Sequence, residues 1–513
     1  MAARNARAAG AMRPPNKSTA CGPTGPGSAR GRDRRGGERT ERGGHPAATI
    51  VALALLAAAG SSACSPPPPP PPVADAPQEP ECQPVLPAPH VLPGTQPEHR
   101  NPGFWISRIE DPDAVVLTPA EIDESNQRAL RLSQEPAGAG APRFALLDES
   151  ADAQVIVGAM QKGIDRHRAA AAKGHRFVAD GGAPPEAFFG DLERIQRAIE
   201  PARTFHVVAR LTDLRCHPTA AGLYEAPGDT DFDLLLCSAL RPGDVVRVIS
   251  RHADGWTLVR SPLVEGWIQG GELGPEITTE AAASFLGSER FVVVTEDRAP
   301  LWASAARRNL LATARVGLRL PLLEEERAGL VRVLAPSSDG LREGFVEADA
   351  VNVGYLPFTR RLLVAHAFRQ LDDTFGWAGA AGDRDCSAFL LDLFSLFGLQ
   401  LPRNSQFQSL AGSYAIDTSA MSEAEKSRAF EHALERGVAL AFMPGHIMLL
   451  LGRDGPDWFA IHQFSGYRVG CRPGHDVKMA VDRVSITTLR LGEGSERRSF
   501  VERISRVAVF GHE

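Results

Sequence analysis

Residues 383–398 read DRDCSAFLLDLFSLFG, in which a cysteine is followed by apolar residues at the spacing of one helix face. Gly398 suits the C-terminal cap, so we expect a helix that begins at about Cys386 and carries these residues on one side: Phe389, Leu390, Leu393, Phe394 and Phe397. The thiol would lie in the first turn, where unpaired N–H groups and the helix dipole favour the thiolate. A nucleophilic cysteine needs this help, because the pKa of a free thiol is about 8.5. The alternative is a small buried cysteine on the apolar face.

Two histidines lie further along the chain in a strand–turn–strand pattern that follows the strand-like residues 438–442. One strand starts at His446, residues 453–455 indicate a turn, and the next strand ends at His462. If this hairpin folds symmetrically about Asp454, the two histidines are cross-strand neighbours with Cβ atoms about 5 Å apart.

A histidine pair so placed suits a general base and its orienting partner. One imidazole takes a thiol proton, and the other accepts a hydrogen bond from its distal N–H. A papain-like site has this arrangement, with a helix-end cysteine facing a strand-borne histidine. Two alternatives remain: a half-buried pair that binds a metal, or a register slip of one residue that puts the two rings on opposite faces.

The chain as a whole predicts several domains, because 513 residues exceed what one hydrophobic core supports. Residues 65–100 are rich in proline and predict a stiff, extended linker. Helix-like spacing predominates over residues 101–204, and short β-runs between turn residues predict small barrels at residues 205–276 and 288–353. Helix and strand patterns alternate in residues 354–513, so the expected fold class is α+β.

Composition and cysteine spacing limit the function. A net charge of -6 with 43% hydrophobic residues is ordinary for a folded protein, and we expect no nucleic-acid partner. The seven cysteines include no Cys-x-x-Cys pair, so no zinc site is predicted. Cys216 and Cys237 could form a disulfide inside the first barrel or remain two buried thiols.

The first 64 residues have the features of an export signal. An arginine-rich block precedes an apolar run at residues 47–59, which is too short for a membrane-spanning helix of about 20 residues. The small residues before Cys64 resemble a bacterial lipobox, although Ser61 stands where leucine is usual. We expect an exported protein of the periplasm or cell envelope, attached to the membrane if Cys64 is lipidated. The alternative is a cleaved signal with an incidental cysteine.

Several motifs together resemble the NlpC-type (NlpC/P60) cell-wall cysteine peptidases of papain-like fold: FGWAG at 375–379, RDCSAFLLDLFSLFG at 384–398, LPRNSQFQ at 401–408 and PGHIMLLLG at 444–452. Residues 101–127 are similar to the N-terminal stabilising domain of one branch of that family. LTDLRCHPTA at 211–220 and the segment 231–249 are similar to the first of its two bacterial Src-homology-3-like barrels. Phe375 and Ala378 depart from the usual YGWGG motif.

The resemblance implies roles for individual residues. Cys386 corresponds to the nucleophile, His446 to the base and His462 to the third, polar member of the site. Asp385 and Ser387 correspond to positions that hold the free N-terminal L-Ala of the substrate, with helix capping as the alternative. Arg403 and Asn404 would shape the cleft or stabilise their loop, and residues 213–217 of the first barrel would restrict the substrate: Asp213, Leu214, Arg215, Cys216 and His217.

The resemblance further implies an endopeptidase that cuts peptidoglycan stem peptides between γ-D-Glu and a diamino acid, usually diaminopimelate. Its partners would be peptidoglycan or muropeptides, the protein would act as a monomer, and no metal or organic cofactor is expected. Two rival functions remain: a non-catalytic cell-wall-binding protein, and a cysteine amidase or acyltransferase of the same fold.

Overall fold

The computed structural model describes residues 87–132, 146–147, 152–252 and 254–513. The predicted leader (residues 1–64, with Cys64) and residues 65–86 of the predicted linker lie outside the described residues, so export and lipidation stay predictions. Within the described ranges, no helix is both long and apolar enough to cross a membrane.

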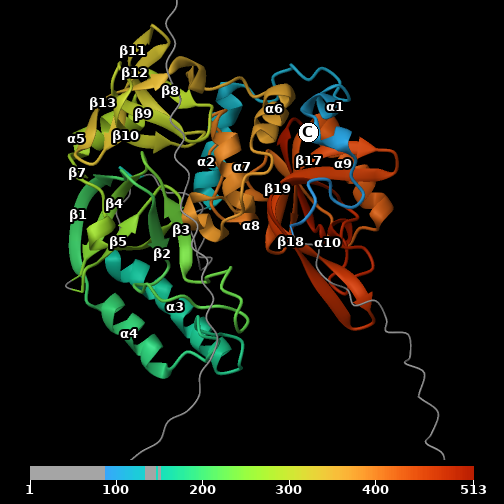
Figure 1. Cartoon of the computed structure of the whole chain (residues 1–513), viewed down its shortest axis with the longest axis horizontal. Helices are drawn as coiled ribbons and strands as arrows, with labels where there is room; N and C mark the ends of the chain where they lie inside the picture. Colours follow the sequence, from blue (N-terminus) through green and yellow to red (C-terminus); the bar gives the residue numbers. More distant parts are fainter. Residues whose placement is uncertain (1–86, 133–145, 148–151, 253) are drawn as a thin grey trace, which may run out of the picture. The chain divides into compact units, whose positions relative to one another are not determined.

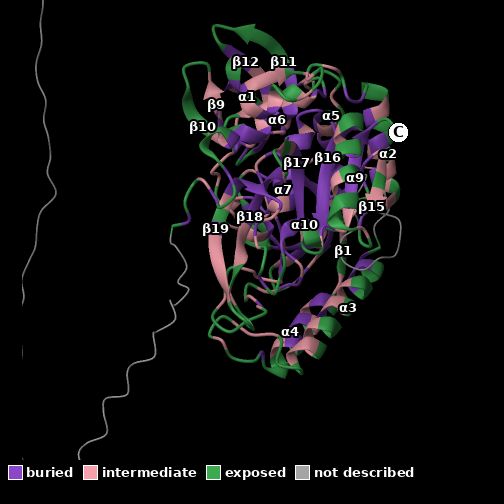
Figure 2. Ribbon diagram, turned by 90° about the vertical axis from the view of Figure 1, so that its right-hand side faces the viewer, coloured by how far each residue is buried: buried purple, intermediate pink, exposed green. Residues whose placement is uncertain are grey.

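The C-terminal part of the chain is built on a six-stranded antiparallel sheet, drawn in red in Figure 1. Its strands in spatial order are β15 (Tyr414–Asp417), β20 (Arg506–Gly511), β16 (Gly437–Met443), β17 (His446–Asp454), β18 (Asp457–Arg472) and β19 (His475–Thr488). Figure 2 shows β16 and β17 buried at its centre. The associated helices are α6 (Arg360–Arg369), η4 (Trp377–Gly382), α7 (Cys386–Ser395), α8 (Ser405–Gln408), α9 (Glu423–Arg436) and α10 (Phe500–Arg503).

Helix α7 begins at Cys386, as the apolar spacing predicts, because Asp385 caps it. The Asp385 side chain accepts a hydrogen bond from the Ala388 N–H at 2.8 Å. Phe389, Leu390, Leu393 and Phe394 are fully buried and pack against β17 and β18 in one core cluster. The expected α+β class, with a helix packed on a sheet in papain-like fashion, is confirmed.

Two seven-stranded antiparallel sheets precede this domain, and the second repeats the strand order of the first. The first sheet has the order β3 (Leu236–Leu240), β2 (Thr212–Arg215), β6 (Glu265–Gln269), β5 (Trp256–Arg260), β4 (Val245–Arg251), β1 (Glu200–Val207), β7 (Glu276–Ile277). The second has β10 (Arg308–Ala314), β9 (Ala299–Ser304), β13 (Gly340–Glu347), β12 (Leu330–Ser337), β11 (Arg319–Arg327), β8 (Phe291–Val294), β14 (Val351–Val353). The 3-10 turns η2 (Gly270–Glu272) and η3 (Ala348–Ala350) precede the last strand of each, and α5 (Thr279–Gly287) joins the two sheets. Two units of one topology in series account for the two sets of β-runs in the sequence.

A disulfide joins Cys216 to Cys237 within the first sheet. It ties β3 to the segment that follows β2, with the two Cα atoms 5.0 Å apart. Of the two alternatives that the sequence allows for this pair, the structure has the disulfide.

The helical region upstream packs in two places. The segments η1 (Pro97–Arg100), α1 (Pro102–Ile106) and α2 (Pro119–Leu132) lie against the C-terminal domain, where Trp105 and Ile122 join the core cluster that contains Phe389. Helices α3 (Ala153–Ala171) and α4 (Glu186–Arg197) pack on each other, and Ile156 of α3 lies against Trp267 of the first sheet. Residues 101–204 therefore pack partly on the C-terminal domain and partly on the first sheet.

The β17–β18 hairpin has a different register from the predicted one. Leu449 pairs with Ile461, and continuing this register places residue 464, rather than residue 462, opposite His446. The reason lies in the turn, because Asp454 itself pairs with Asp457 and only two residues connect them.

A bulge after Leu450 then decides which way the histidines point. Near the turn, Gly452 pairs with Phe459. If this register continued along both strands, His446 and His462 would lie on opposite faces of the sheet. The extra residue, Leu451, shifts the pairing by one, and the two histidines become diagonal neighbours on the same face. The predicted proximity is therefore found, although the predicted partner position is wrong by two residues.

Candidate active site

The Cys386 thiol lies at the junction of α7 and β17. Its side chain is partly exposed, and among the described residues it is the free cysteine. The thiol accepts hydrogen bonds from the backbone N–H groups of Ser387 and Ile447, and both lower its pKa. Since Ile447 directly follows His446, these contacts bring the thiol to the start of the strand that carries the predicted base.

His446, His462 and Thr487 form a hydrogen-bonded relay. The Nε2 atom of His446 lies 2.7 Å from Nδ1 of His462, and Nε2 of His462 lies 2.8 Å from the Thr487 hydroxyl. When Thr487 accepts from His462 and His462 accepts from His446, the Nδ1 atom of His446 carries no proton. That nitrogen is then the base that a neighbouring thiol requires.

Aromatic side chains fix both imidazoles. Phe464 stacks on His462 with ring centroids 4.3 Å apart, and Phe500 of α10 contacts His462 edge-on at 5.5 Å. His462 and Thr487 are fully buried, whereas His446 keeps partial exposure. The relay thus has a buried end that orients it and an exposed end that can meet a substrate.

The charges around the site favour a neutral thiol and a neutral imidazole in the free protein. Burial, and then the Asp385 carboxylate, raise the pKa of Cys386 to about 12 although its side chain is partly exposed. Burial, and then the positive charge of Arg503, lower the pKa of His446 to about 3. Proton transfer from Cys386 to His446 is therefore unfavourable until a substrate carbonyl accepts the negative charge.

The residues predicted to bind substrate, Asp385, Ser387 and Arg403, form one hydrogen-bonded group. Arg403 donates to both oxygens of Asp385, at 3.1 and 2.7 Å, and to the Ser387 hydroxyl at 2.8 Å. Ser387 in turn donates to Asp385 at 2.9 Å. Burial alone would raise the pKa of Asp385, but the charge of Arg403 outweighs it and lowers that pKa. Arg403 also binds Ser238 of β3 at 3.1 Å, which links the group to the first sheet.

The first sheet meets the site through β3 and the loop before it. Ala239 of β3 packs against Gly379 in the loop that precedes Cys386, and Trp377 of that loop donates to the Asp233 carbonyl at 2.9 Å. These contacts lie outside residues 213–217. Arg215 of that range reaches them indirectly, through an ion pair with Asp233 at 2.6 Å.

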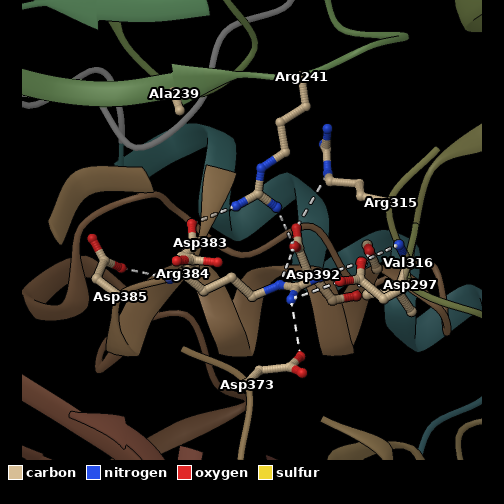
Figure 3. A network of polar contacts seen from close by, with 12 residues as sticks. Ala239, Arg241, Asp297, Arg315, Val316, Asp373, Asp383, Arg384, Asp385 and Asp392 are labelled. Carbon is tan, nitrogen blue, oxygen red and sulfur yellow. Dashed lines mark hydrogen bonds and ion pairs between the residues drawn. The ribbon is translucent and has the colours of Figure 1, made fainter. Parts of the chain in front are cut away.

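A buried ion-pair network behind the site is drawn in Figure 3. Asp392 of α7 is 4% exposed and contacts three guanidinium groups: Arg241 and Arg384 at 2.8 Å each and Arg315 at 3.3 Å. Arg384 lies two residues before Cys386 and also binds Asp297 at 2.6 Å. Burial would raise the pKa of Asp392, but the three arginines lower it to about 2.

Sequence reasoning missed four contributors to the relay and its surroundings: Phe464, and three residues beyond residue 471. Thr487 belongs to a strand-like run whose pattern carries no chemical signal, and Phe500 and Arg503 belong to a four-residue helix. The Ser-x-x-Glu capping box at Ser499 and Glu502 was the one signal that could have located α10. Within the described ranges, no group of three or more His, Cys, Asp or Glu side chains is arranged to hold a metal ion.

A cysteine at a helix N-terminus beside a strand-borne histidine relay defines the class of papain-like cysteine hydrolases. The NlpC/P60 family model matches residues 372–480, so the chain carries an NlpC/P60 domain, and the match includes Cys386, His446 and His462. That family consists typically of cell-wall peptidases, which makes this domain a cysteine hydrolase in the broad sense.

A solved structure agrees with this assignment of fold. The chain is similar to an NlpC/P60 endopeptidase from Photobacterium damselae subsp. piscicida, with 15% identity and a TM-score of 0.60 over 79% of this chain and 96% of that one. It also matches an NlpC/P60 family protein from Bacillus cereus ATCC 10987, with 19% identity and a TM-score of 0.38 over 54% of this chain and 83% of that one. The first likeness shows a shared fold that extends beyond the peptidase domain. No curated protein matches the chain.

Proposed function

We propose that the protein is an exported endopeptidase that hydrolyses the γ-D-glutamyl–diaminopimelate bond of peptidoglycan stem peptides by a Cys-His-His mechanism. The observation that carries this proposal is the His446–His462–Thr487 relay, together with a Cys386 thiol that binds the N–H of Ile447, the residue after His446, within an NlpC/P60 domain.

The mechanism follows from the proton arrangement of the relay. Nδ1 of His446 takes the thiol proton as the sulfur attacks the γ-carbonyl carbon of D-Glu, and His462 stabilises the imidazolium through its Nδ1 acceptor. Backbone N–H groups at the start of α7 stabilise the oxyanion. The C–N bond breaks, the leaving amine takes the proton from His446, and a thioester remains on Cys386.

Water completes the cycle. His446 removes a proton from the water as its oxygen attacks the thioester, and the carbon–sulfur bond breaks. The γ-carboxylic acid of D-Glu leaves and loses its proton to solvent, and the sulfur recovers its proton from His446, so the free enzyme is restored.

Asp385 supports recognition of the free N-terminal amine of the stem peptide. Its Oδ1 atom accepts three hydrogen bonds, whereas Oδ2 accepts one, from Arg403, within the described part of the chain. The remaining lone pairs of Oδ2 suit an ammonium donor. The role of Arg403 is then to hold this carboxylate ionised and in place. Export and lipidation at Cys64 complete the proposal and rest on the leader sequence alone.

The test is incubation of the mature protein with L-Ala-γ-D-Glu-diaminopimelate peptides, followed by mass spectrometry. We expect the wild type to release L-Ala-D-Glu, and Cys386→Ser and Cys386→Ala to release none. A protein that binds these peptides or intact peptidoglycan without cleaving them would be a binding module, and cleavage of another amide would indicate a related amidase.

A further inference from the structure

Three arginines lie in or next to α10, which contacts the relay through Phe500, and they have no role in the mechanism above. Arg497 and Arg498 precede α10, and Arg503 is its last residue. The same short helix carries Phe500, whose ring centroid is 6.1 Å from that of His446. Arg503 follows Phe500 by three residues, so the two side chains lie on neighbouring positions of one helix face. We call Arg497, Arg498 and Arg503 the arginine cluster.

Within the described residues, Arg498 lies close enough to Glu502 to help lower the pKa of that carboxyl, after the hydrogen bonds from Ser499. None of the three guanidinium groups makes an ion pair or a hydrogen bond there. Arg497 and Arg498 are exposed to water, whereas Arg503 is half-buried, and buried arginines elsewhere, such as Arg241, Arg384 and Arg403, do have ion pairs.

The carboxylates nearest in sequence are already engaged. Glu502 accepts hydrogen bonds from the backbone N–H and the hydroxyl of Ser499, at 2.8 and 2.6 Å. Asp476 accepts from the backbone N–H groups of Glu496 and Arg497. Lys426 adds a further positive charge, because it donates to the Val501 and Glu502 carbonyls at 2.9 Å each. The surface beside His446 is therefore cationic, and Arg503 is its half-buried member with no ion pair within the described residues.

The positive charge of the arginine cluster changes the pKa values of groups nearby, as a position next to His446 predicts. Burial, Arg497 and Arg498 together lower the pKa of Arg503 to about 10. After burial, Arg503 is also the strongest influence that lowers the pKa of His446. A partly buried guanidinium without a partner is unfavourable unless an anion joins it, and arginine pairs best with a carboxylate in a two-pronged hydrogen bond.

The position relative to His446 indicates which part of a substrate would supply the anion. His446 delivers its proton to the leaving amine, so groups packed around its ring face the leaving side of the scissile bond, whereas Asp385 and Arg403 lie on the acyl side at α7. In the proposed reaction the leaving residue is a diamino acid. Diaminopimelate carries one more carboxylate than lysine, the other common diamino acid.

We propose that the arginine cluster, with Arg503 at its centre, is an anion-binding subsite that takes a carboxylate of the leaving diamino acid and so selects diaminopimelate over lysine. The inference rests on the proposed endopeptidase function and deepens it, because it assigns the substrate class to named residues of the leaving-group side.

The test compares L-Ala-γ-D-Glu-meso-diaminopimelate with L-Ala-γ-D-Glu-L-lysine as substrates of the wild type, Arg503→Gln and Arg503→Lys. The wild type should prefer the diaminopimelate peptide by about tenfold to a hundredfold in kcat/KM, the value of a hydrogen bond to a charged group. Arg503→Gln should lose most of this preference through a higher KM for that peptide alone, and Arg503→Lys should retain part of it. Arg453→Gln, at the far end of β17, is the matched control and should keep the full preference.

Two results would overturn the subsite. One is an equal loss of kcat on both peptides in Arg503→Gln, which would mean that Arg503 acts only through the pKa of His446. The other is an unchanged preference in Arg503→Gln.

Binding measurements separate this inference from the proposed function. Calorimetric titration of Cys386→Ala and of the double variant Cys386→Ala/Arg503→Gln with the same two peptides needs no cleavage. If the wild type cleaves neither peptide but the diaminopimelate peptide binds at least tenfold more weakly to the double variant, the endopeptidase proposal fails and the subsite stands. If cleavage occurs without any dependence on Arg503 in rate or binding, the subsite fails and the endopeptidase proposal stands. If neither cleavage nor Arg503-dependent binding is found, both fail.

Discussion

The proton state of the site depends on His462, which is enclosed completely. Its two ring nitrogens contact His446 and Thr487, and Phe464 covers one face of the ring. Burial, and then the charge on His446, hold the pKa of His462 well below its usual value. A protonated His462 would present two donors and lose the acceptor that orients His446. The relay therefore requires His462 to stay neutral, and this requirement couples the fold to pH.

We predict that His462→Gln reduces the loss of stability in mild acid. The unfolded chain takes up a proton at each of these imidazoles near pH 6.5, whereas the folded chain does not until far lower pH, about 3 for His446. The contribution of these two neutral imidazoles to the free energy of unfolding is thus full above pH 6.5 and declines as the pH falls below that value. Thermal unfolding at pH 7.5 and pH 5 should show a smaller drop in Tm for His462→Gln than for the wild type. The exposed His475→Gln should retain the wild-type drop, and an equal drop in all three proteins would contradict the argument.

Thr487 is a positioning residue at the buried end of the relay. We predict that Thr487→Val lowers kcat about tenfold with little change in KM, because it removes the partner that fixes the His462 tautomer. Thr487→Ser keeps the hydroxyl and should recover most of the rate. Steady-state kinetics on the tripeptide substrate measures both. A loss in Thr487→Ser as large as in Thr487→Val would instead indicate a packing role for the methyl group.

At the scale of elements, local sequence patterns predict whether a segment forms a helix or a strand better than they predict the register in which a strand pairs. The helix at Cys386 follows from apolar spacing and a capping aspartate, both of which are local. The register of β17 and β18 does not, because Leu449, Leu450 and Leu451 are all apolar and conceal the bulge between them. His446 and His462 were found because a register error of two residues preserves the face of a strand. Thr487 was missed because its contact with His462 depends on pairing with a third strand.

The loop η4, which precedes Cys386, packs against strand β3 of the first sheet. Its residues Ala378, Gly379 and Ala381 have positive φ angles, and a Cβ atom on Gly379 would lie 2.6 Å from that of Ala239. We predict that Gly379→Ala lowers both the Tm and the rate of cleavage, since the loop must shift away from β3 or displace it. Gly174→Ala is the matched control, with a φ of +73° and nothing within 4 Å of the added Cβ. It should show only the backbone strain, about 1 kcal/mol, and leave the rate unchanged, so equal effects of the two substitutions would contradict the steric argument.

At the scale of the whole described unit, Asp392 joins three parts of the chain. Arg241 follows β3 of the first sheet, Arg315 follows β10 of the second, and Arg384 lies in the loop before Cys386 (Figure 3). A carboxylate on the inner side of α7 thus ties both sheets to the peptidase domain. The sequence could not predict this, because Asp392 occupies a helix position like any solvated aspartate and its partners lie up to 151 residues away.

We predict that Asp392→Asn destabilises the protein by about 3–5 kcal/mol, the range for a buried ion pair that loses one partner. Three guanidinium groups would keep their burial but lose the charge that compensates them, and the Arg384 loop would no longer be fixed beside Cys386. Chemical denaturation should show the loss, and the rate of peptide cleavage should fall with it. Asp113→Asn is the matched control, because Asp113 binds Arg361 at 2.6 Å in an exposed pair, and exposed pairs contribute little. If Asp392→Asn were as stable and as active as Asp113→Asn, the sheets would be held in place by apolar contacts alone, and the network would have no part in placing the cysteine.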